Sequence, residues 1–262
     1  MNKIDKLFKE KKNHILSIYF TAGYPGLNDT NTIITELQEN GVDMIEVGMP
    51  FSDPLADGPT IQHASEMALE NGMSIRLLFD QLSKSQVRNS KAAILLMGYI
   101  NPVLQYGIEK FCKEASDLGV DGVILPDLPM QEYLDEYKPF FEKYGLKNVF
   151  LITPQTTENR IRFIDEHSNG FIYMVSSSST TGAKEEIQHT QETYFKRIQA
   201  MNLRNPTIIG FGISDNKTFE KACEYANGAI IGSAFVKALG ESKSLKGDIG
   251  SFIKKIQLQS VK

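Results

Sequence analysis

Two acidic side chains in one stretch of the sequence are placed to carry out proton transfer. Glu46 is the single carboxylate in a short apolar run from Met44 to Gly48, and Asp57 follows in a proline-rich loop. Successive side chains of a strand point to opposite faces, so Glu46 shares a face with Met44 and Gly48. If both faces of that strand are covered, Glu46 is buried, and a buried carboxyl is either paired or has a raised pKa.

The loop that carries Asp57 contains Pro50, Pro54 and Pro59, which restrict its backbone. A rigid loop that presents one acid beside a strand that carries another indicates general acid–base catalysis, in which the more buried acid has the higher pKa. Both acids also have a structural interpretation. Glu46 could be satisfied by a backbone N–H or a hydroxyl, and Asp57 could stabilise the turn that follows it.

Glycines after two late apolar runs indicate a phosphate-binding site. Gly212 follows one run, and Gly232 follows the next and precedes Ser233. Glycine lets the backbone approach an anion, and Ser233 begins a predicted helix whose N-terminal N–H groups favour negative charge. Gly182 is expected to contribute from a third loop. The alternative is that these glycines only permit tight turns and that Ser233 is an ordinary N-cap.

Residue types that are missing from the predicted strand ends narrow the reaction. A Schiff-base aldolase needs a lysine there, whereas Lys184 lies in a predicted loop. A metal-dependent aldolase needs clustered ligands, whereas the histidines are scattered at positions 14, 63, 167 and 189. We therefore expect proton-transfer chemistry on a small phosphorylated substrate, with no metal and no organic cofactor.

The elements that must position these groups repeat along the chain. Short apolar runs alternate with amphipathic helical segments about eight times at a spacing of roughly 30 residues, the length of a βα unit. The runs begin near residues 15, 44, 92, 122, 148, 171, 207 and 229. Near-continuous apolar strands joined by helices predict a parallel sheet that is covered on both faces. We predict an α/β fold, a single (β/α)8 TIM barrel over residues 1–262, with an open doubly wound sheet as the alternative.

Two additions to the repeat are predicted. A short amphipathic helix over Ile4–Lys12 precedes the first strand and is expected to cover the bottom of the barrel. An additional helix follows the second strand, because helical patterns run through Ala64–Leu69 and again through Leu77–Leu82.

In such a barrel the active site lies at the C-terminal ends of the strands. The candidates that fall at that end include Glu46, Tyr173, Gly212 and Gly232. Apolar residues expected to line a pocket near the same rim, with core packing as the alternative, are Tyr19, Leu96, Leu125, Phe211 and Ile213. The stretch from Ser176 to about His189 is expected to be a loop that closes over the site.

The composition is typical of a globular protein. Of 262 residues, 41% are hydrophobic and 23% are charged, and the net charge of -4 gives no electrostatic case for binding nucleic acid or an anionic membrane. The first residues lack the apolar segment of a signal peptide, and no apolar run is long enough to span a membrane. Cys112 and Cys223 have no metal-like spacing. We expect a cytoplasmic protein.

The most specific motif is EVGMPFSDPLADGP, from Glu46 to Pro59. The other motifs that accompany it are Phe20-Thr21, Pro126-Asp127-Leu128-Pro129, Thr181-Gly182 and Gly210-Phe211-Gly212-Ile213-Ser214. With these motifs, the chain resembles the α subunit of tryptophan synthase over nearly its whole length. The resemblance implies a lyase of tryptophan biosynthesis that cleaves indole-3-glycerol phosphate to indole and glyceraldehyde 3-phosphate in a retro-aldol step.

The resemblance also implies roles for individual residues. Glu46 would move protons between the glycerol hydroxyl and indole C3, and Asp57 would hold the indole N–H as positive charge develops on the ring. Tyr173 would help to position the substrate, and Thr181 would reach Asp57 when the loops close. The residues that would hold the phosphate, mostly through backbone N–H groups, are Gly182, Gly212, Gly232 and Ser233. The implied partner is a pyridoxal-phosphate β subunit that receives indole through a tunnel in an α2β2 complex.

The sequence departs from the family pattern at one place. Ser177 and Ser179 stand where many members have Arg and Gly, which puts loop closure and communication with the partner in question. Two other functions stay open. One is another phosphate-binding barrel, such as a sugar-phosphate isomerase or the synthase of indole-3-glycerol phosphate, although the synthase needs a strand-end lysine. The other is a barrel that has lost catalysis and only binds or activates a partner, against which both acids argue.

Overall fold

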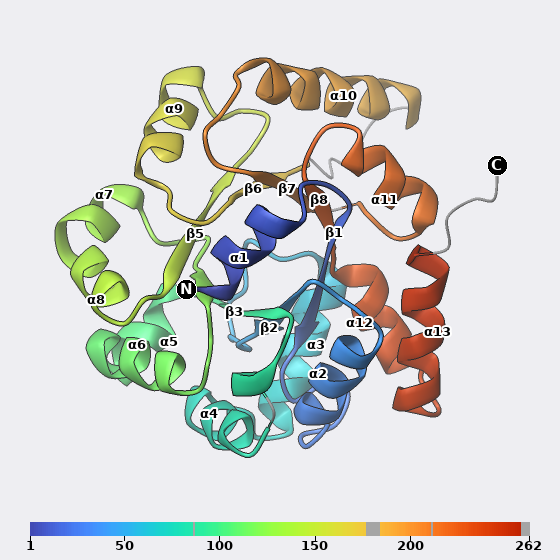
Figure 1. Cartoon of the computed structure of the whole chain (residues 1–262). Coiled ribbons are helices and arrows are strands. Elements are labelled where there is room, and N and C mark those ends of the chain that lie inside the picture. The colour runs from blue at the N-terminus through green and yellow to red at the C-terminus, as the bar shows by residue number, and fades with distance from the viewer. Residues whose placement is uncertain (86, 177–183, 211, 258–262) are drawn as a thin grey trace.

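The computed structural model of the protein describes residues 1–85, 87–176, 184–210 and 212–257, with the backbone alone for residues 184–190. In this part of the chain, eight parallel strands follow one another around a closed barrel, and β8 pairs with β1 (Figure 1). The strands are β1 Ile15–Thr21, β2 Met44–Gly48, β3 Ala93–Met97, β4 Gly122–Ile124, β5 Lys147–Ile152, β6 Ile172–Val175, β7 Thr207–Gly210 and β8 Gly228–Ile231. The predicted (β/α)8 barrel is confirmed, and the open sheet is wrong.

Helices surround this barrel on the outside (Figure 1). They are α1 Lys3–Glu10, α2 Thr30–Glu39, α3 Pro59–Glu70, α4 Ile75–Ser83, α5 Ile100–Tyr106, α6 Ile108–Asp117, α7 Met130–Glu132, α8 Lys138–Lys143, α9 Glu158–His167, α10 Lys184–Ala200, α11 Asn216–Cys223, α12 Ser233–Gly240 and α13 Leu245–Gln257, with a 3-10 turn at Val87–Asn89 and a π turn at Tyr133–Tyr137. The predicted additional helix after the second strand is confirmed, since both α3 and α4 follow β2. None of the helices in the described ranges combines the length and apolar character needed to cross a bilayer.

Side chains of the strands alternate between two apolar layers. On β2, Met44 belongs to the layer inside the barrel, whereas Ile45 and Val47 belong to the layer between the strands and the helices. Glu46, between Ile45 and Val47, therefore points inward. Leu96 belongs to the outer layer, as the core-packing alternative predicts. Leu125 packs in the same layer and also lines a separate pocket with Pro126, Asp127 and Leu128. The inward residues of β3 are Ala93, Leu95 and Met97, one position out of phase with Leu96.

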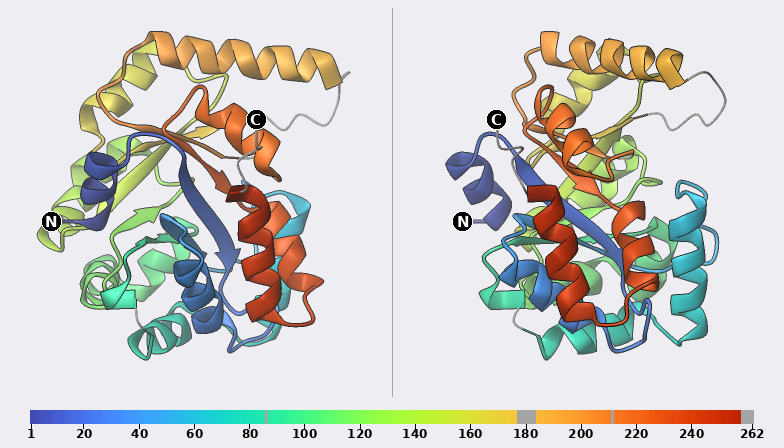
Figure 2. Two further views of the ribbon diagram at one scale, coloured as in Figure 1. Left: turned by 45° about the vertical axis from the view of Figure 1, so that its right-hand side comes forward. Right: turned by 90° about the vertical axis from the view of Figure 1, so that its right-hand side faces the viewer.

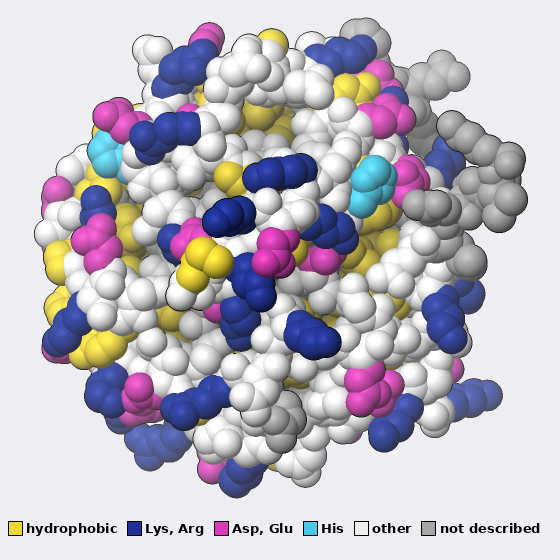
Figure 3. Space-filling view, viewed as in Figure 1, with side chains coloured by type: hydrophobic (Ala, Val, Ile, Leu, Met, Phe, Trp, Pro, Cys, Tyr) yellow, Lys and Arg dark blue, Asp and Glu magenta, His cyan; other side chains and the backbone are white. Residues whose placement is uncertain are grey.

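The helix α1 covers the N-terminal opening of the barrel, as predicted (Figure 1). Ile4 and Phe8 are buried in the inner layer, and the Phe8 ring lies 5.8 Å from the ring of Phe171 at the start of β6. The outward face of this helix is rich in lysine, and Figure 3 shows Lys and Arg side chains around the centre of this end of the molecule. An amphipathic helix thus closes the end of the barrel opposite the predicted active site.

Two helical segments differ from the sequence prediction. The helix α10 begins at Lys184, so residues 184–189 are not part of a loop after Ser176. The helix α13, which the sequence analysis missed, buries Ile249, Ile253 and Ile256 and lies beside α12 (Figure 2).

Candidate active site

Glu46 is completely buried inside the barrel. It lies in register with Tyr19 on β1 and Leu95 on β3, and its exposed fraction is 0%. Ser17 donates a hydrogen bond of 2.7 Å from Oγ to Glu46 Oε1, while Oε2 is buried and has no hydrogen-bond partner among the described residues. Burial raises the pKa of Glu46 to about 7, and the Ser17 hydrogen bond opposes this shift.

Asp57 lies in the loop between β2 and α3, where its backbone and side chain are both held. Its N–H donates to the Pro54 carbonyl at 3.0 Å, and its own carbonyl accepts from Gln62 Nε2 at 2.9 Å. The Tyr99 hydroxyl donates to Asp57 Oδ2 at 3.1 Å and accepts from the Ala56 N–H at 3.0 Å. Burial raises the pKa of Asp57 to about 6, against the effect of the Tyr99 hydrogen bond.

Two tyrosines lie across glycines of neighbouring strands. Tyr19 on β1 lies against Gly48 on β2, and Tyr173 on β6 lies against Gly210 on β7. A Cβ atom at either glycine would collide with the phenol ring, so the missing side chain makes room for it. Both tyrosines are buried, and burial together with the nearby carboxyls of residues 46 and 57 raises their pKa above the ordinary value. The two acids and two neutral phenols therefore share one interior region.

The predicted phosphate-binding glycines end two adjacent strands. Gly212 follows β7 with a φ of 76°, a conformation that favours glycine. Gly232 follows β8 and caps α12, which begins at Ser233. A Cβ at Gly232 would face Tyr19 and Ile61 at 3.6 to 3.7 Å, which places this glycine beside the inner tyrosine. The remaining predicted residues Thr181, Gly182 and Phe211 lie outside the described residues, as do Ser177 and Ser179.

Two residues of this region were missed by the sequence analysis. Ser17 is a polar residue within the largely apolar β1, and it lies on the same face of the strand as Tyr19. This shared face was the signal that the sequence offered. Tyr99 lies just after β3, at the end of the barrel where active sites form, and its ring packs on Phe51 with a centroid distance of 5.1 Å. Its contact with Asp57 joins two loops that are separate in the sequence. The spacing of residues within either loop does not predict such a contact.

Asp127 is a further acid near this region, since it contributes to the raised pKa of Tyr99. His63 is exposed on α3, with its Nδ1 3.9 Å from Glu66. The described residues contain no group of three or more His, Cys, Asp or Glu side chains arranged to hold a metal ion.

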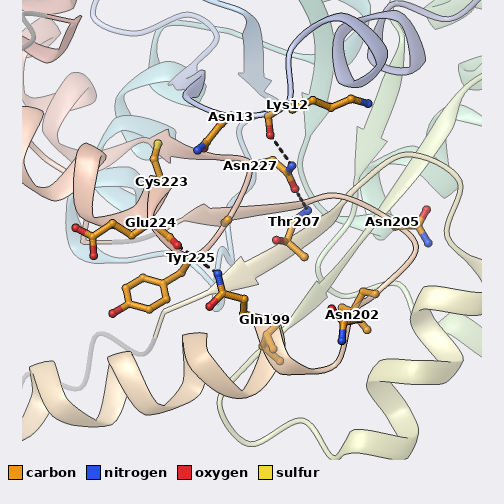
Figure 4. A pocket seen from close by; sticks show the side chains of 13 residues that line it. Lys12, Asn13, Gln199, Asn202, Asn205, Thr207, Cys223, Glu224, Tyr225 and Asn227 are labelled. Atoms are coloured by element: carbon orange, nitrogen blue, oxygen red, sulfur yellow. Dashed lines mark hydrogen bonds between the residues drawn. The ribbon is translucent and has the colours of Figure 1, made fainter.

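A pocket of about 320 Å³ lies beside the start of β7, at the opposite end of the barrel (Figure 4). Its lining is rich in amides that are already bonded, since Asn227 donates to the Lys12 carbonyl at 2.7 Å and accepts from the Thr207 N–H at 2.9 Å. Neither Glu46 nor Asp57 lines it.

Comparison with known proteins identifies one family. A family model described as "Tryptophan synthase alpha chain" matches residues 5–259. The tryptophan synthase alpha chain of Flavobacterium johnsoniae is 60% identical over 258 residues, which cover 98% of this chain and 100% of that protein. The alpha chain of Bacteroides thetaiotaomicron is 53% identical over 243 residues, which cover 93% of this chain and 94% of the relative.

Solved structures agree with the sequence relatives. The crystal structure of tryptophan synthase subunit alpha from Legionella pneumophila is 32% identical, with a TM-score of 0.87 and coverage of 98% of this chain and 97% of that one. The tryptophan synthase A-subunit from Pyrococcus furiosus is 36% identical, with a TM-score of 0.83 and coverage of 94% and 98%. The chain belongs to the tryptophan synthase alpha chain family.

Proposed function

We propose that Glu46 and Asp57 are the catalytic residues of this protein and that residues 1–262 form one barrel domain. As a member of the tryptophan synthase alpha chain family, the protein is a carbon–carbon lyase that cleaves indole-3-glycerol phosphate to indole and D-glyceraldehyde 3-phosphate. The observation that carries the assignment of the two acids is their shared surroundings. Both raise the pKa of the same buried tyrosines, Tyr19 and Tyr173, so both act on one interior region.

Glu46 would transfer the proton that the cleavage requires. C3 of the indole first receives a proton from the Glu46 carboxyl, which makes the ring cationic. The hydroxyl proton on the adjacent glycerol carbon then passes to the Glu46 carboxylate, the bond between that carbon and C3 breaks, and the carbon becomes the aldehyde. The electron pair of the broken bond returns to the ring and gives neutral indole, so no net proton is gained or lost. A group that both accepts and donates a proton works best with a pKa near the operating pH, and that of Glu46 is about 7.

Asp57 would stabilise the charge that forms on the ring. Protonation at C3 makes the indole nitrogen positive, and an ionised carboxylate that accepts a hydrogen bond from its N–H lowers the energy of that state. The pKa of Asp57, about 6, leaves it mostly ionised when Glu46 is half protonated. Tyr99 would hold the carboxylate oxygen Oδ2 in place through their 3.1 Å hydrogen bond.

The remaining predicted residues would bind the substrate. Tyr173, buried beside the two acids, would position the indole and glycerol groups. The phosphate would lie at the ends of β7 and β8, where the positive φ of Gly212 and the first turn of α12 support an anion site. The residues assigned to this site are Gly182, Gly212, Gly232 and Ser233. From the resemblance alone, Thr181 would reach Asp57, and Phe211 would line the apolar part of the pocket.

The partner that we propose is the tryptophan synthase β subunit, in an α2β2 complex that passes indole to a pyridoxal-phosphate site on that subunit. Tryptophan synthase from M. tuberculosis has been solved in an aminoacrylate-bound form, and the chain matched there is 29% identical, with a TM-score of 0.85 over 98% of both chains. We expect addition of a β subunit to raise the rate of indole release. An unchanged rate with every β subunit tested would contradict this partner.

Incubation of the purified protein with indole-3-glycerol phosphate tests the catalytic assignment. General acid–base catalysis contributes on the order of 10³-fold, so Glu46→Gln and Asp57→Asn should each lower kcat for indole release by about that factor. The control is Asp53→Asn, because Asp53 is an exposed acid of the same loop whose side chain bonds only Ser52 among the described residues. Indole release by Glu46→Gln at a rate close to wild type would refute the assignment.

A further inference from the structure

Ser17 lies inside the barrel in a position that favours apolar side chains. It is completely buried in β1, and the same face of that strand carries Ile15 and Tyr19. Its register partners on the neighbouring strands are Met44 on β2 and Ile230 on β8, both in the inner apolar layer. A hydroxyl in such a layer destabilises the fold unless it is hydrogen-bonded. The hydrogen bond that Ser17 makes among the described residues goes to Glu46.

We propose that Ser17 is a positioning residue of the active site, whose hydroxyl orients the Glu46 carboxyl and favours its ionised form. Ser17 pairs with Met44 while Tyr19 pairs with Glu46, so the serine lies one layer closer to the N-terminal end of the barrel. Its 2.7 Å hydrogen bond directs Oε1 toward that layer. Oε2, which is buried and has no partner among the described residues, is then the oxygen left for the substrate.

The other groups that face Glu46 do not replace this bond. Tyr19 on β1 and Tyr173 on β6 lie near it, and both are phenols. Asp57, in the loop after β2, acts on the same two tyrosines and is an acid. Within the described part of the chain, no Lys, Arg or His contributes to the pKa of Glu46, and the Ser17 hydrogen bond is the influence that opposes burial. One neutral hydroxyl therefore sets how far burial drives Glu46 toward its protonated form.

This inference rests on the proposed role of Glu46, and a titration tests it directly. The infrared carboxyl band that Glu46→Gln removes reports the protonation of residue 46, with or without turnover. A hydrogen bond to an ionised group is worth about one pKa unit or slightly more, so Ser17→Ala should move this titration upward by about one unit. The limb of the pH profile of kcat that reports Glu46 should also move to higher pH. This holds whether the reaction starts from the protonated or the ionised form of Glu46.

Two further variants separate positioning from packing. Ser17→Thr keeps a hydroxyl and should return the titration toward the wild-type value. Ser90→Ala removes another buried hydroxyl, which donates to the Ala92 carbonyl at 2.8 Å at the start of β3, and should leave the titration and the pH profile unchanged. If Ser17→Ala does not fold, Ser17→Cys preserves the volume with a weaker donor and should shift the titration in the same upward direction.

The outcomes distinguish this inference from the catalytic assignment. A wild-type titration and pH profile in Ser17→Ala, together with an inactive Glu46→Gln, would overturn the role of Ser17 and leave Glu46 catalytic. An active Glu46→Gln would overturn both. An upward shift in Ser17→Ala that Ser17→Thr reverses and Ser90→Ala does not reproduce would support the proposal.

Discussion

The two ends of the barrel both bury carboxyls, and they treat them differently. At the N-terminal end, Asp121 accepts hydrogen bonds from the backbone N–H groups of Lys3 and Ile94 at 3.1 and 2.9 Å, and the Lys3 ammonium lies 3.2 Å away. Asp43 at the same end accepts from the Lys11 ammonium at 2.6 Å and the Leu16 N–H at 2.8 Å. Nearer the opposite end, Glu46 receives one bond from a hydroxyl.

The different hydrogen-bond donors at the two ends give the carboxyls different roles. Backbone N–H groups and ammonium groups stabilise a carboxylate strongly, so the acids at the N-terminal end tie α1 to the strands. A neutral hydroxyl offsets only part of the cost of burial, so Glu46 and Asp57 titrate near neutral pH. The same residue type thus contributes to stability at one end and is available for proton transfer at the other.

The largest effect is expected from Glu46→Gln on stability at high pH. The pKa of Glu46 is about 7 in the folded protein, whereas its ordinary value is 4.5. Between these two pH values the folded state binds more protons than the unfolded state, so the free energy of unfolding falls as the pH rises. Glu46→Gln has no carboxyl at this position to ionise, so its free energy of unfolding does not fall for this reason. Its stability relative to wild type should increase by on the order of 3 kcal/mol between about pH 4 and pH 9.

Urea denaturation of both proteins across this pH range measures the change. A difference in stability that does not vary with pH would mean that burial does not raise the pKa of Glu46, and the contrast between the two ends would disappear. Asp53→Asn, at an exposed acid, should track wild type at every pH.

A smaller effect of opposite sign is expected at the N-terminal end. Asp121→Asn puts an amide NH2 group against either the Lys3 or the Ile94 N–H and weakens the contact with the Lys3 ammonium. Loss of one such buried bond should lower the free energy of unfolding by about 2 kcal/mol, with kcat unchanged. Urea denaturation and the indole assay at neutral pH measure both. A large loss of kcat in the folded variant would contradict the view that acids at the N-terminal end contribute to stability and not to catalysis.

The smallest effect is expected from Tyr99→Phe. The Tyr99 hydrogen bond lowers the pKa of Asp57 against the effect of burial, so its removal should raise that pKa above about 6. Indole release should fall a few-fold at about pH 6 and recover at about pH 8, where Asp57 is ionised in both proteins. Tyr106→Phe is the matched control, because it loses a hydroxyl that donates to Glu114 and not to Asp57. A pH profile identical to wild type would show that Tyr99 does not act on Asp57.

The barrel could be predicted because its signals are local. Apolar runs, their spacing and the period of two place Glu46 inward on β2 without knowledge of any other strand. The exact phase of Leu96 on β3 could not be read, because a strand that is apolar on both faces has no alternation to count. The helix α13 was missed although it buries isoleucines at helical spacing.

The partners of the acids could not be predicted in the same way. Ser17 reaches Glu46 across 29 positions of sequence and Tyr99 reaches Asp57 across 42, and both contacts depend on strand register and loop packing. The sequence indicates which residues are titratable, whereas the pKa of each depends on neighbours that only the closed barrel brings together. The assignments of Thr181, Gly182 and Phe211 remain predictions, since these residues lie outside the described ranges.

The ring-on-glycine contacts of Tyr19 with Gly48 and Tyr173 with Gly210 limit how this protein can be redesigned. A side chain introduced at either glycine needs a smaller residue at the facing tyrosine, and a smaller residue at the tyrosine alone leaves a void. Each tyrosine and the glycine that it faces on the neighbouring strand should therefore be varied together. Libraries aimed at new indole derivatives should encode positions 19 with 48, and 173 with 210, as linked codons.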